Sequence, residues 1–186
     1  TSVLAQGGGI PASMNNPQVN LSRGGKLYRI SSERLLADPE LDTTMRGGDK
    51  VFLEADKRYF LSLGASGTQA QVSFPRDRVT ALEAMSLIGG LKASTADPKG
   101  ILILRDYPDS AVRSDARGPS RDRMIFALDL TSADGLFSAG EFDIQNRDLV
   151  LVTQSPLVNT STIISLTGSA FRLGSTTDAL VNNLQN

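Results

Sequence analysis

The sequence predicts an α+β fold of tandem β-grasp-like modules, the first truncated at its N-terminus, followed by a C-terminal amphipathic helix. Three observations predict this organisation. One short pattern occurs twice along the chain, the second copy of it reads as strands and a helix in mixed order, and the composition changes after residue 155. Self-similarity of this kind indicates an array of one small structural unit.

The repeat is defined by landmarks that recur in the same order. They are a glycine-terminated helix end at 8–10 and 89–91, an arginine at the end of a strand at Arg23 and Arg105, and an aspartate before a strand at Asp49 and Asp148. The copies are offset by 81, 82 and 99 residues at these landmarks, so the second copy carries an insertion near residues 106–122. We expect a partial first module at 1–56, a second module at 57–155 and a tail at 156–186.

The first module opens with the end of a helix, which glycines close at residue 10. Alternating residues at 19–23 and 26–30 on either side of a Gly-Gly pair predict a hairpin. A serine-capped helical turn at 31–37 and a strand at 50–54 follow. Because Asp49 follows a glycine pair, we expect its carboxylate to accept hydrogen bonds from the backbone of that turn rather than to bind a ligand.

The second module contains a complete set of elements. The sequence predicts strands at 59–63 and 71–74, a helix at 79–88 ended by Gly89 and Gly90, and strands at 101–105, 124–128 and 149–152, with a loop and a turn leading to the last strand. One helix that crosses a mixed sheet is an α+β arrangement. The order of the elements is that of a β-grasp.

Composition excludes several classes of function. The net charge of −1, from 19 basic and 20 acidic residues, argues against a nucleic-acid partner, because nucleic-acid binders usually carry a basic excess. The absence of Cys and His removes zinc sites, thiol nucleophiles and the usual catalytic base. An enzyme would depend on carboxylates, and the pairs near turns are Glu54/Asp56, Asp106/Asp109, Asp129/Asp134 and Glu141/Asp143. None has a spacing that requires catalysis, so we expect no enzyme and no cofactor.

The insertion at 106–123 is polar and contains two prolines. Long polar loops on a rigid scaffold are common places for binding residues. Tyr107, Arg113 and Arg117 are the candidates here for contact with a glycan or a partner protein. The alternative is a solvated or partly disordered loop.

The tail is poor in charge and rich in Ser, Thr and Asn. On a helix, its apolar residues form one stripe: Ile163, Leu166, Ala170, Leu173 and Leu180. The opposite side carries Asn159, Ser165, Ser169 and Arg172. The tail lacks about 18 consecutive apolar residues, so it is a poor solitary transmembrane helix, although several copies could enclose water between their polar sides. A coiled-coil helix, a helix that packs on protein, or a frayed tail is the alternative.

Together these features resemble SLBB modules, the soluble ligand-binding β-grasp repeats of the bacterial outer-membrane polysaccharide export family. The resemblance rests on the glycine-ended segments 2–10 and 84–91, on Arg23 and Arg105, and on the runs 128–130, 142–152 and 155–157. It covers nearly the whole chain.

The resemblance implies a passage for capsular or extracellular polysaccharide. Copies of the protein would form a homo-oligomeric ring in the periplasm of a Gram-negative bacterium, and their tails would join in a barrel through the outer membrane. The apolar stripe of the tail would then face lipid and its polar side would face the lumen. The implied partners are the polysaccharide, further copies of the chain, the outer membrane and an inner-membrane polysaccharide co-polymerase.

Proteins of this family also have an N-terminal export-signature domain, usually with a lipidated Cys. This sequence does not include such a domain, so we expect a piece of a longer protein. The alternative function is a periplasmic β-grasp pair that holds a glycan or a protein, with the tail packed on the second module and no span across a membrane. A carboxylate-dependent glycan-processing enzyme is a third option and needs two carboxylates about 5–10 Å apart in one cleft.

Overall fold

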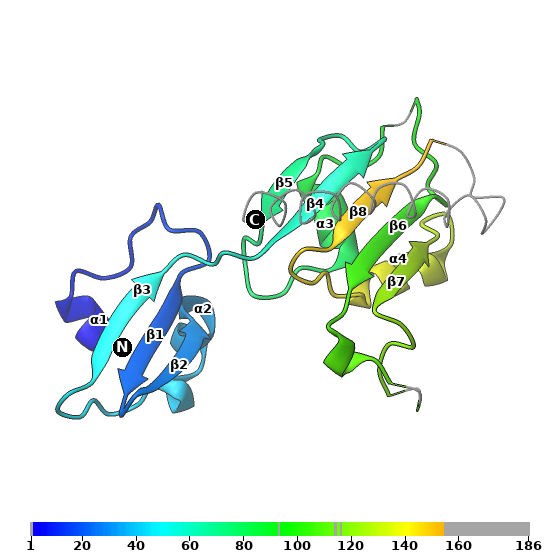
Figure 1. Ribbon diagram of the computed structural model, residues 1–186. Coiled ribbons are helices and arrows are strands. Elements are labelled where there is room, and N and C mark those ends of the chain that lie inside the picture. The colour runs from blue at the N-terminus through cyan, green and yellow to red at the C-terminus, as the bar shows by residue number, and fades with distance from the viewer. Residues whose placement is uncertain (1, 93, 114, 116, 155–186) are drawn as a thin grey trace, which may run out of the picture.

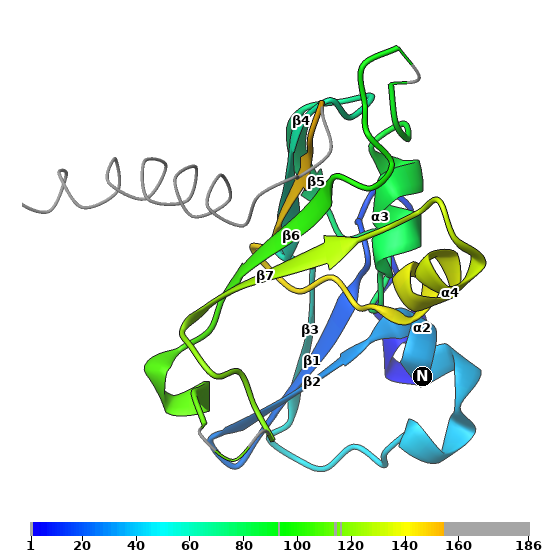
Figure 2. The same ribbon diagram turned by 90° about the vertical axis from the view of Figure 1, so that its right-hand side faces the viewer.

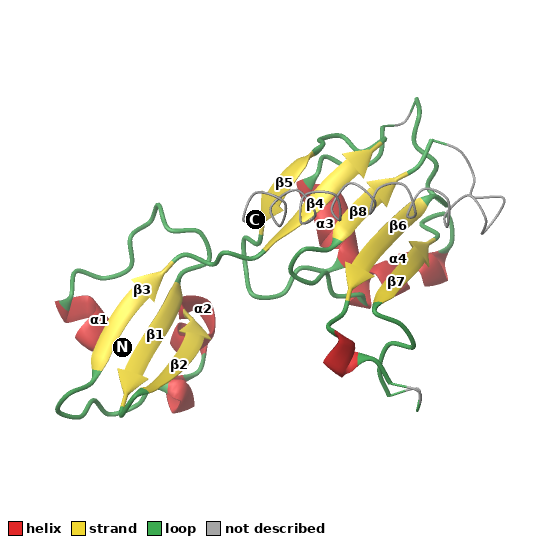
Figure 3. Cartoon of the chain, viewed as in Figure 1, coloured by secondary structure: helices red, strands yellow, loops and turns green. Residues whose placement is uncertain are grey.

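The computed structural model describes residues 2–154 except 93, 114 and 116. These residues form two β-sheets with helices (Figure 1, Figure 3). The first sheet has the strand order β2-β1-β3, and the second has the order β5-β4-β8-β6-β7. The predicted α+β class is confirmed.

The first module follows the predicted order closely. Its elements are α1 (Ser2–Gln6), β1 (Gln18–Arg23), β2 (Lys26–Ser31), α2 (Ser32–Ala37), the short 3-10 helix η1 (Pro39–Leu41) and β3 (Lys50–Glu54). Gly24 and Gly25 both have positive φ angles, 55° and 77°, which a two-residue hairpin turn requires. The Ser31 hydroxyl accepts a hydrogen bond from the Arg34 amide at 3.2 Å and so caps α2 as predicted.

The second module contains more elements than the sequence predicts. They are β4 (Tyr59–Gly64), β5 (Ala70–Ser73), α3 (Ala81–Leu87), β6 (Ile101–Asp106), the 3-10 helix η2 (Asp109–Ala111), β7 (Arg123–Leu128), α4 (Ala133–Glu141) and β8 (Leu149–Val152). Thr80 caps α3 in a reciprocal capping box with Glu83, which fixes the start of the helix.

The prediction of a loop and a turn before β8 is wrong, because α4 occupies most of that segment. Two glycines inside α4, Gly135 and Gly140, lower its helix propensity and mask the signal. The helix forms nonetheless because the Ser132 hydroxyl caps it, accepting from the Gly135 amide at 3.0 Å, and because Ala139 is completely buried. In the first module, α2 stands at the corresponding place, after β2.

The two modules share one strand arrangement. β1 pairs antiparallel with both β2 and β3, and β6 pairs antiparallel with both β7 and β8. The second module adds β4, which runs parallel to β8, and β5, which is antiparallel to β4. Figure 2 shows α3 and α4 on the same side of the second sheet. The core lies between these two layers and includes Phe60, Phe74, Ile88, Ile101, Ile103 and Val150.

A buried carboxylate joins the modules. Asp56, 8% exposed, lies in the segment between β3 and β4. It accepts hydrogen bonds from the Asn16 amide group at 2.7 Å and from the Arg58 guanidinium at 2.9 Å. Asn15 donates to the backbone oxygen of Phe74 at 3.0 Å, so a loop of the first module also bonds directly to the second. These hydrogen bonds link the two modules directly.

Candidate functional site

The landmarks of the repeat form the same ion pair in both modules. Arg23, at the end of β1, donates from Nε and Nη2 to Asp49 at 3.0 and 2.6 Å. Arg105, near the end of β6, donates from Nε and Nη2 to Asp148 at 2.9 and 2.7 Å. Each bidentate pair, which we call a clasp, ties one antiparallel strand to the turn before its neighbour.

The backbone contacts of the two clasps also match. Asp49 accepts a hydrogen bond from the Arg46 amide and Asp148 accepts one from the Gln145 amide, both at 2.8 Å and both three residues upstream. The arginines donate to the backbone oxygens of Thr44 and Asp143, five residues before each aspartate, at 2.8 and 2.7 Å. The prediction that Asp49 serves the backbone of its turn is confirmed.

The clasps differ in burial. The side chains of Arg105 and Asp148 are 7% and 1% exposed, whereas Arg23 in the first clasp is 23% exposed. Arg105 also lies over the rings of Phe126 and Phe142, 5.4 and 5.1 Å from their centroids. Burial lowers the pKa of Arg105, but its hydrogen bonds with Asp148 and the Tyr107 hydroxyl outweigh burial, so the net shift is upward. This arginine is therefore a structural cation that stays charged.

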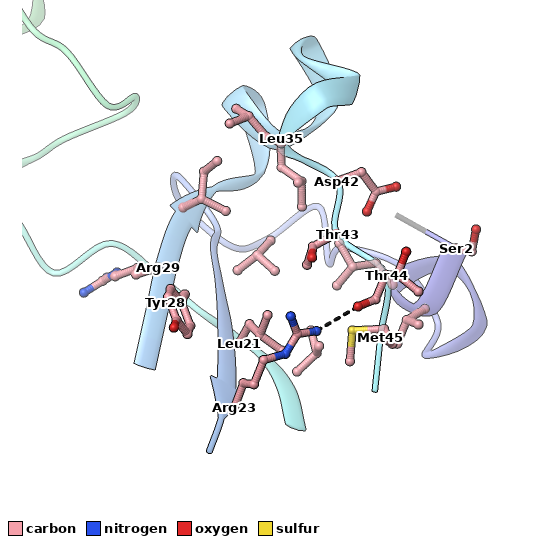
Figure 4. Close-up of a pocket in the computed structure, with 16 residues that line it drawn as sticks. Ser2, Leu21, Arg23, Tyr28, Arg29, Leu35, Asp42, Thr43, Thr44 and Met45 are labelled. Carbon is pink, nitrogen blue, oxygen red and sulfur yellow. Dashed lines mark hydrogen bonds between the residues drawn. The ribbon is translucent and has the colours of Figure 1, made fainter. Parts of the chain in front are cut away.

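The sequence gives no hint of a cavity of about 850 Å³ in the first module (Figure 4). Its walls come from α1, β1, β2, β3, α2 and the segment around Met45. Leu21, Leu35 and Met45 give it apolar walls, and Arg23 and Thr44 add polar groups. The volume lies within the range of small-molecule sites, and an apolar wall with a few polar groups is typical of such sites.

The described part of the first module has fewer strands than the second module. In the second module, β4 runs along β8 and contributes Phe60 to the core, and Phe74 follows β5. Within the described residues, β3 has no strand at the corresponding edge, and α1 has no buried residue.

The structure places the predicted loop residues at the end of the β6–β7 hairpin. Tyr107 lies at the base, where its amide donates to the Asp122 backbone oxygen at 2.6 Å and its hydroxyl accepts from Arg105 at 3.3 Å. Arg113 and Arg117 are both exposed, and the Arg113 amide donates to the Pro119 oxygen at 2.9 Å. Tyr107 therefore contributes hydrogen bonds at the base of the hairpin, whereas the side chains of Arg113 and Arg117 are exposed in the loop.

The predicted tail residues lie outside the described residues. They are Ile163, Leu166, Ala170, Leu173 and Leu180 of the apolar stripe, and Asn159, Ser165, Ser169 and Arg172 of the polar side. Of the helices that the structure describes, each is too short or too polar to cross a bilayer.

Several of the carboxylates considered for catalysis pair with neighbouring groups: Glu54, Asp56, Asp106, Asp129 and Asp143. Lys57 pairs with Glu54, and this ion pair lowers the Glu54 pKa. Burial raises the pKa of Asp56. The hydrogen bonds from Arg58 and its positive charge outweigh this effect, so the pKa of Asp56 is below its ordinary value. A general acid at neutral pH needs a raised pKa, and both shifts have the opposite sign. In the described ranges, the structure brings no three metal-ligating side chains together.

Comparison with known proteins finds similarity to several curated proteins named for polysaccharide export. The chain is 26% identical to the capsule polysaccharide export outer membrane protein CtrA of Neisseria meningitidis over 98% of its own length and 49% of that protein. It is 30% identical to the capsule polysaccharide export protein BexD of Haemophilus influenzae, covering 81% of the chain and 40% of BexD.

The name of a third relative refers to EPS I polysaccharide rather than to a capsule. The EPS I polysaccharide export outer membrane protein EpsA of Ralstonia nicotianae is 27% identical over 88% of the chain and 41% of EpsA. The chain therefore spans about half the length, or less, of the curated relatives it matches. No protein-family model matches it.

Proposed function

Because the chain belongs to the family of bacterial outer-membrane proteins that export capsular and extracellular polysaccharide, we propose that it is part of such an exporter in the periplasm and outer membrane of a Gram-negative bacterium. The observation that carries the proposal is the similarity to CtrA over 98% of the chain, which includes both modules and the tail. In this proposal the two modules are SLBB repeats, and the clasp is a structural feature that both repeats share.

The proposed mechanism is passive passage through a ring of identical copies. An asymmetric contact, repeated head to tail, closes into a ring when the rotation between copies allows it. The modules form the periplasmic part of the ring, and the tails form a barrel in which every backbone polar group is bonded within its own helix. In that barrel the apolar stripe faces lipid, and Asn159, Ser165, Ser169 and Arg172 face the aqueous lumen. The exporter receives polymer from an inner-membrane co-polymerase.

The functional test is the location of polysaccharide in the host. Removal of the gene should leave polymer inside the cell envelope and deplete it from the surface, and the full-length gene should restore surface polymer. A gene lacking residues 157–186 should express stable protein without restoring it. Normal surface polysaccharide in the deletion strain would contradict the export function.

A second candidate function is a periplasmic module that binds a glycan or a protein without spanning the membrane. The cavity in the first module favours it, since about 850 Å³ bounded by apolar walls can accommodate a ligand. This candidate predicts that the gene lacking residues 157–186 restores surface polysaccharide fully. It also predicts that Leu21→Trp, which fills the cavity, abolishes the function, whereas the exporter tolerates that change as long as the protein folds.

A further inference from the structure

The described hydrophobic core does not continue from one module into the other. The core cluster of the second module lies entirely within residues 60–152. The described strands also form two separate sheets, so no ladder of strand pairs crosses between the modules. Figure 1 shows these sheets apart, with the segment between β3 and β4 passing from one to the other. In the described part of the chain, a set of polar contacts crosses the joint between the modules.

These polar contacts form a closed network. The Asp56 carboxylate accepts hydrogen bonds from the Asn16 amide group at 2.7 Å and from Nε and the backbone amide of Arg58 at 2.9 and 3.0 Å. Arg58 donates from Nη1 to the Asp77 backbone oxygen at 2.9 Å. Asn16 and Gln18 donate to the Asp77 carboxylate, both at 3.4 Å, which returns the network to the first module. We call these five residues the joint network.

The joint network is buried at its centre and reaches water at its rim. The side chain of Asp56 is 3% exposed, whereas those of Arg58 and Asp77 are 37% and 29% exposed. Arg58 also lies over the Phe74 ring, 4.8 Å from its centroid. Because Arg58 and Asp77 already contact water, rearrangement of the network does not leave either charge in a dry interior.

Asn16 is held in the left-handed region of backbone conformation. Its φ angle is 39°, and the residue is 6% exposed. A residue with a side chain keeps such a conformation only where surrounding contacts impose it, and these residues gather at clamps and switch regions. The bonds from Asn16 to Asp56 and Asp77 supply such contacts, so the turn before β1 is coupled to the joint.

We propose that the joint network is a latch. When the latch is closed it fixes the angle between the modules, and when it is open the second module turns about residues 55–58 while both modules stay folded. Residues 55–58 lie between the end of β3 and the start of β4, outside both strands. Small polar interfaces between the domains of one chain permit relative motion, whereas large apolar ones prevent it. The inference goes beyond the proposed export function and does not depend on it.

Hydrogen bonds suit a latch because water can replace them. When the joint opens, Asn16, Gln18 and the Asp77 carboxylate exchange bonds within the protein for bonds with water, so the net cost is small compared with the strength of each bond. Separation of two apolar surfaces has no such compensation. A single hydrogen bond to a charged group still shifts an equilibrium by about tenfold or more, so the loss of one bond changes the balance between closed and open measurably.

The test is the distribution of distances between two spin labels, one in each module, measured by double electron-electron resonance. The chain has no cysteine, so Leu36→Cys on α2 and Leu136→Cys on α4 provide the only two attachment points. These leucines are 62% and 42% exposed, so the labels displace no core residue. Labelled chains are diluted with unlabelled ones, so that distances between copies do not contribute.

Two latch variants and one control are compared in this labelled chain. Asn16→Gly removes the donating amide group, and glycine adopts a positive φ without strain, so the turn keeps its path. Asp56→Ala removes the carboxylate to which Asn16 and Arg58 donate. Asp109→Ala is the control, because Asp109 is exposed on the 3-10 helix η2. Unfolding curves verify that each variant is folded, and Asn16→Gly alone decides the test if Asp56→Ala is not.

We expect one narrow distance peak in the labelled wild type and in the control, because the latch is closed. Both latch variants should broaden this peak or add a second one, with the ratio of closed to open lowered by about tenfold. If folded Asn16→Gly and Asp56→Ala keep the narrow peak of the wild type, contacts other than the network hold the joint and the inference is overturned. A broad distribution in the wild type itself would also overturn it, since the network would then not fix the angle. The measurement does not involve polysaccharide, so failure of the latch leaves the proposed export function standing.

Discussion

The buried clasp of the second module should contribute more to stability than any other ion pair that the structure describes. We consider the change Asp148→Asn, which keeps the shape of the side chain and removes its charge. In the wild type, Asp148 accepts two hydrogen bonds from Arg105 and one from the Gln145 amide. Asparagine can accept at only one oxygen, and its amide group would face a guanidinium N–H, donor against donor.

The expected cost follows from burial. Arg105 is 7% exposed and Asp148 is 1% exposed, so water cannot replace the lost partner. Removal of one member of a buried pair leaves an uncompensated charge and costs about 3–5 kcal/mol. Urea unfolding followed by circular dichroism measures this loss. Asp49→Asn should cost less, because Arg23 can turn to solvent, and the exposed Asp109→Asn is a control with little effect.

A double variant tests the cause of the loss. Arg105→Met together with Asp148→Asn removes the unpaired cation, so it should recover part of the stability lost in Asp148→Asn alone. A loss below about 1 kcal/mol for Asp148→Asn would refute the reasoning, since a lost buried partner must cost more than an ordinary surface change. A larger loss for Asp49→Asn than for Asp148→Asn would refute it as well.

Three further predictions concern other parts of the chain. Hydrogen bonds from Arg23 and from a backbone amide lower the Asp49 pKa to about 2 in the folded protein, below its unfolded value of about 4. The stabilisation that the ionised Asp49 provides is therefore complete above about pH 4 and is lost as the pH falls toward 2. When unfolding is measured across this acid range, the stability of Asp49→Asn should depend less on pH than that of the wild type. Thr80→Ala removes the hydroxyl that accepts from the Glu83 amide at 3.2 Å, so thermal unfolding should reveal a loss of about 1 kcal/mol, and an unchanged midpoint would contradict the capping role. Arg113→Ala with Arg117→Ala should weaken binding of the host polysaccharide in calorimetry without changing unfolding, because both residues are exposed, and equal affinity would exclude this loop as a glycan contact.

The sequence predicts most strands because their patterns are local. The hairpin around Gly24 and Gly25, the strand at 50–54 and the serine cap of α2 all depend on neighbouring residues, and the structure confirms them. Both arginines and both aspartates of the clasps are evident as landmarks of the repeat. Their pairing is not, because it joins residues 26 and 43 positions apart through contacts between β1 and β3 and between β6 and β8.

The features that the sequence does not reveal depend on tertiary contacts. α4 contains two glycines, and it is stabilised by its cap and by the burial of Ala139 rather than by propensity. The cavity in the first module is bounded by residues from several separate segments, so no local pattern in the sequence marks it. Which of the two alternating sets of residues in each strand of the second sheet faces the helices also depends on the register of the strands.

The most direct test of the proposed exporter is the mass of the full-length protein with and without residues 157–186, measured by light scattering in detergent and in plain buffer. The account predicts a large closed oligomer that requires detergent only when these residues are present. A monomer or dimer that is independent of detergent in both forms would contradict the channel and favour the periplasmic binding module.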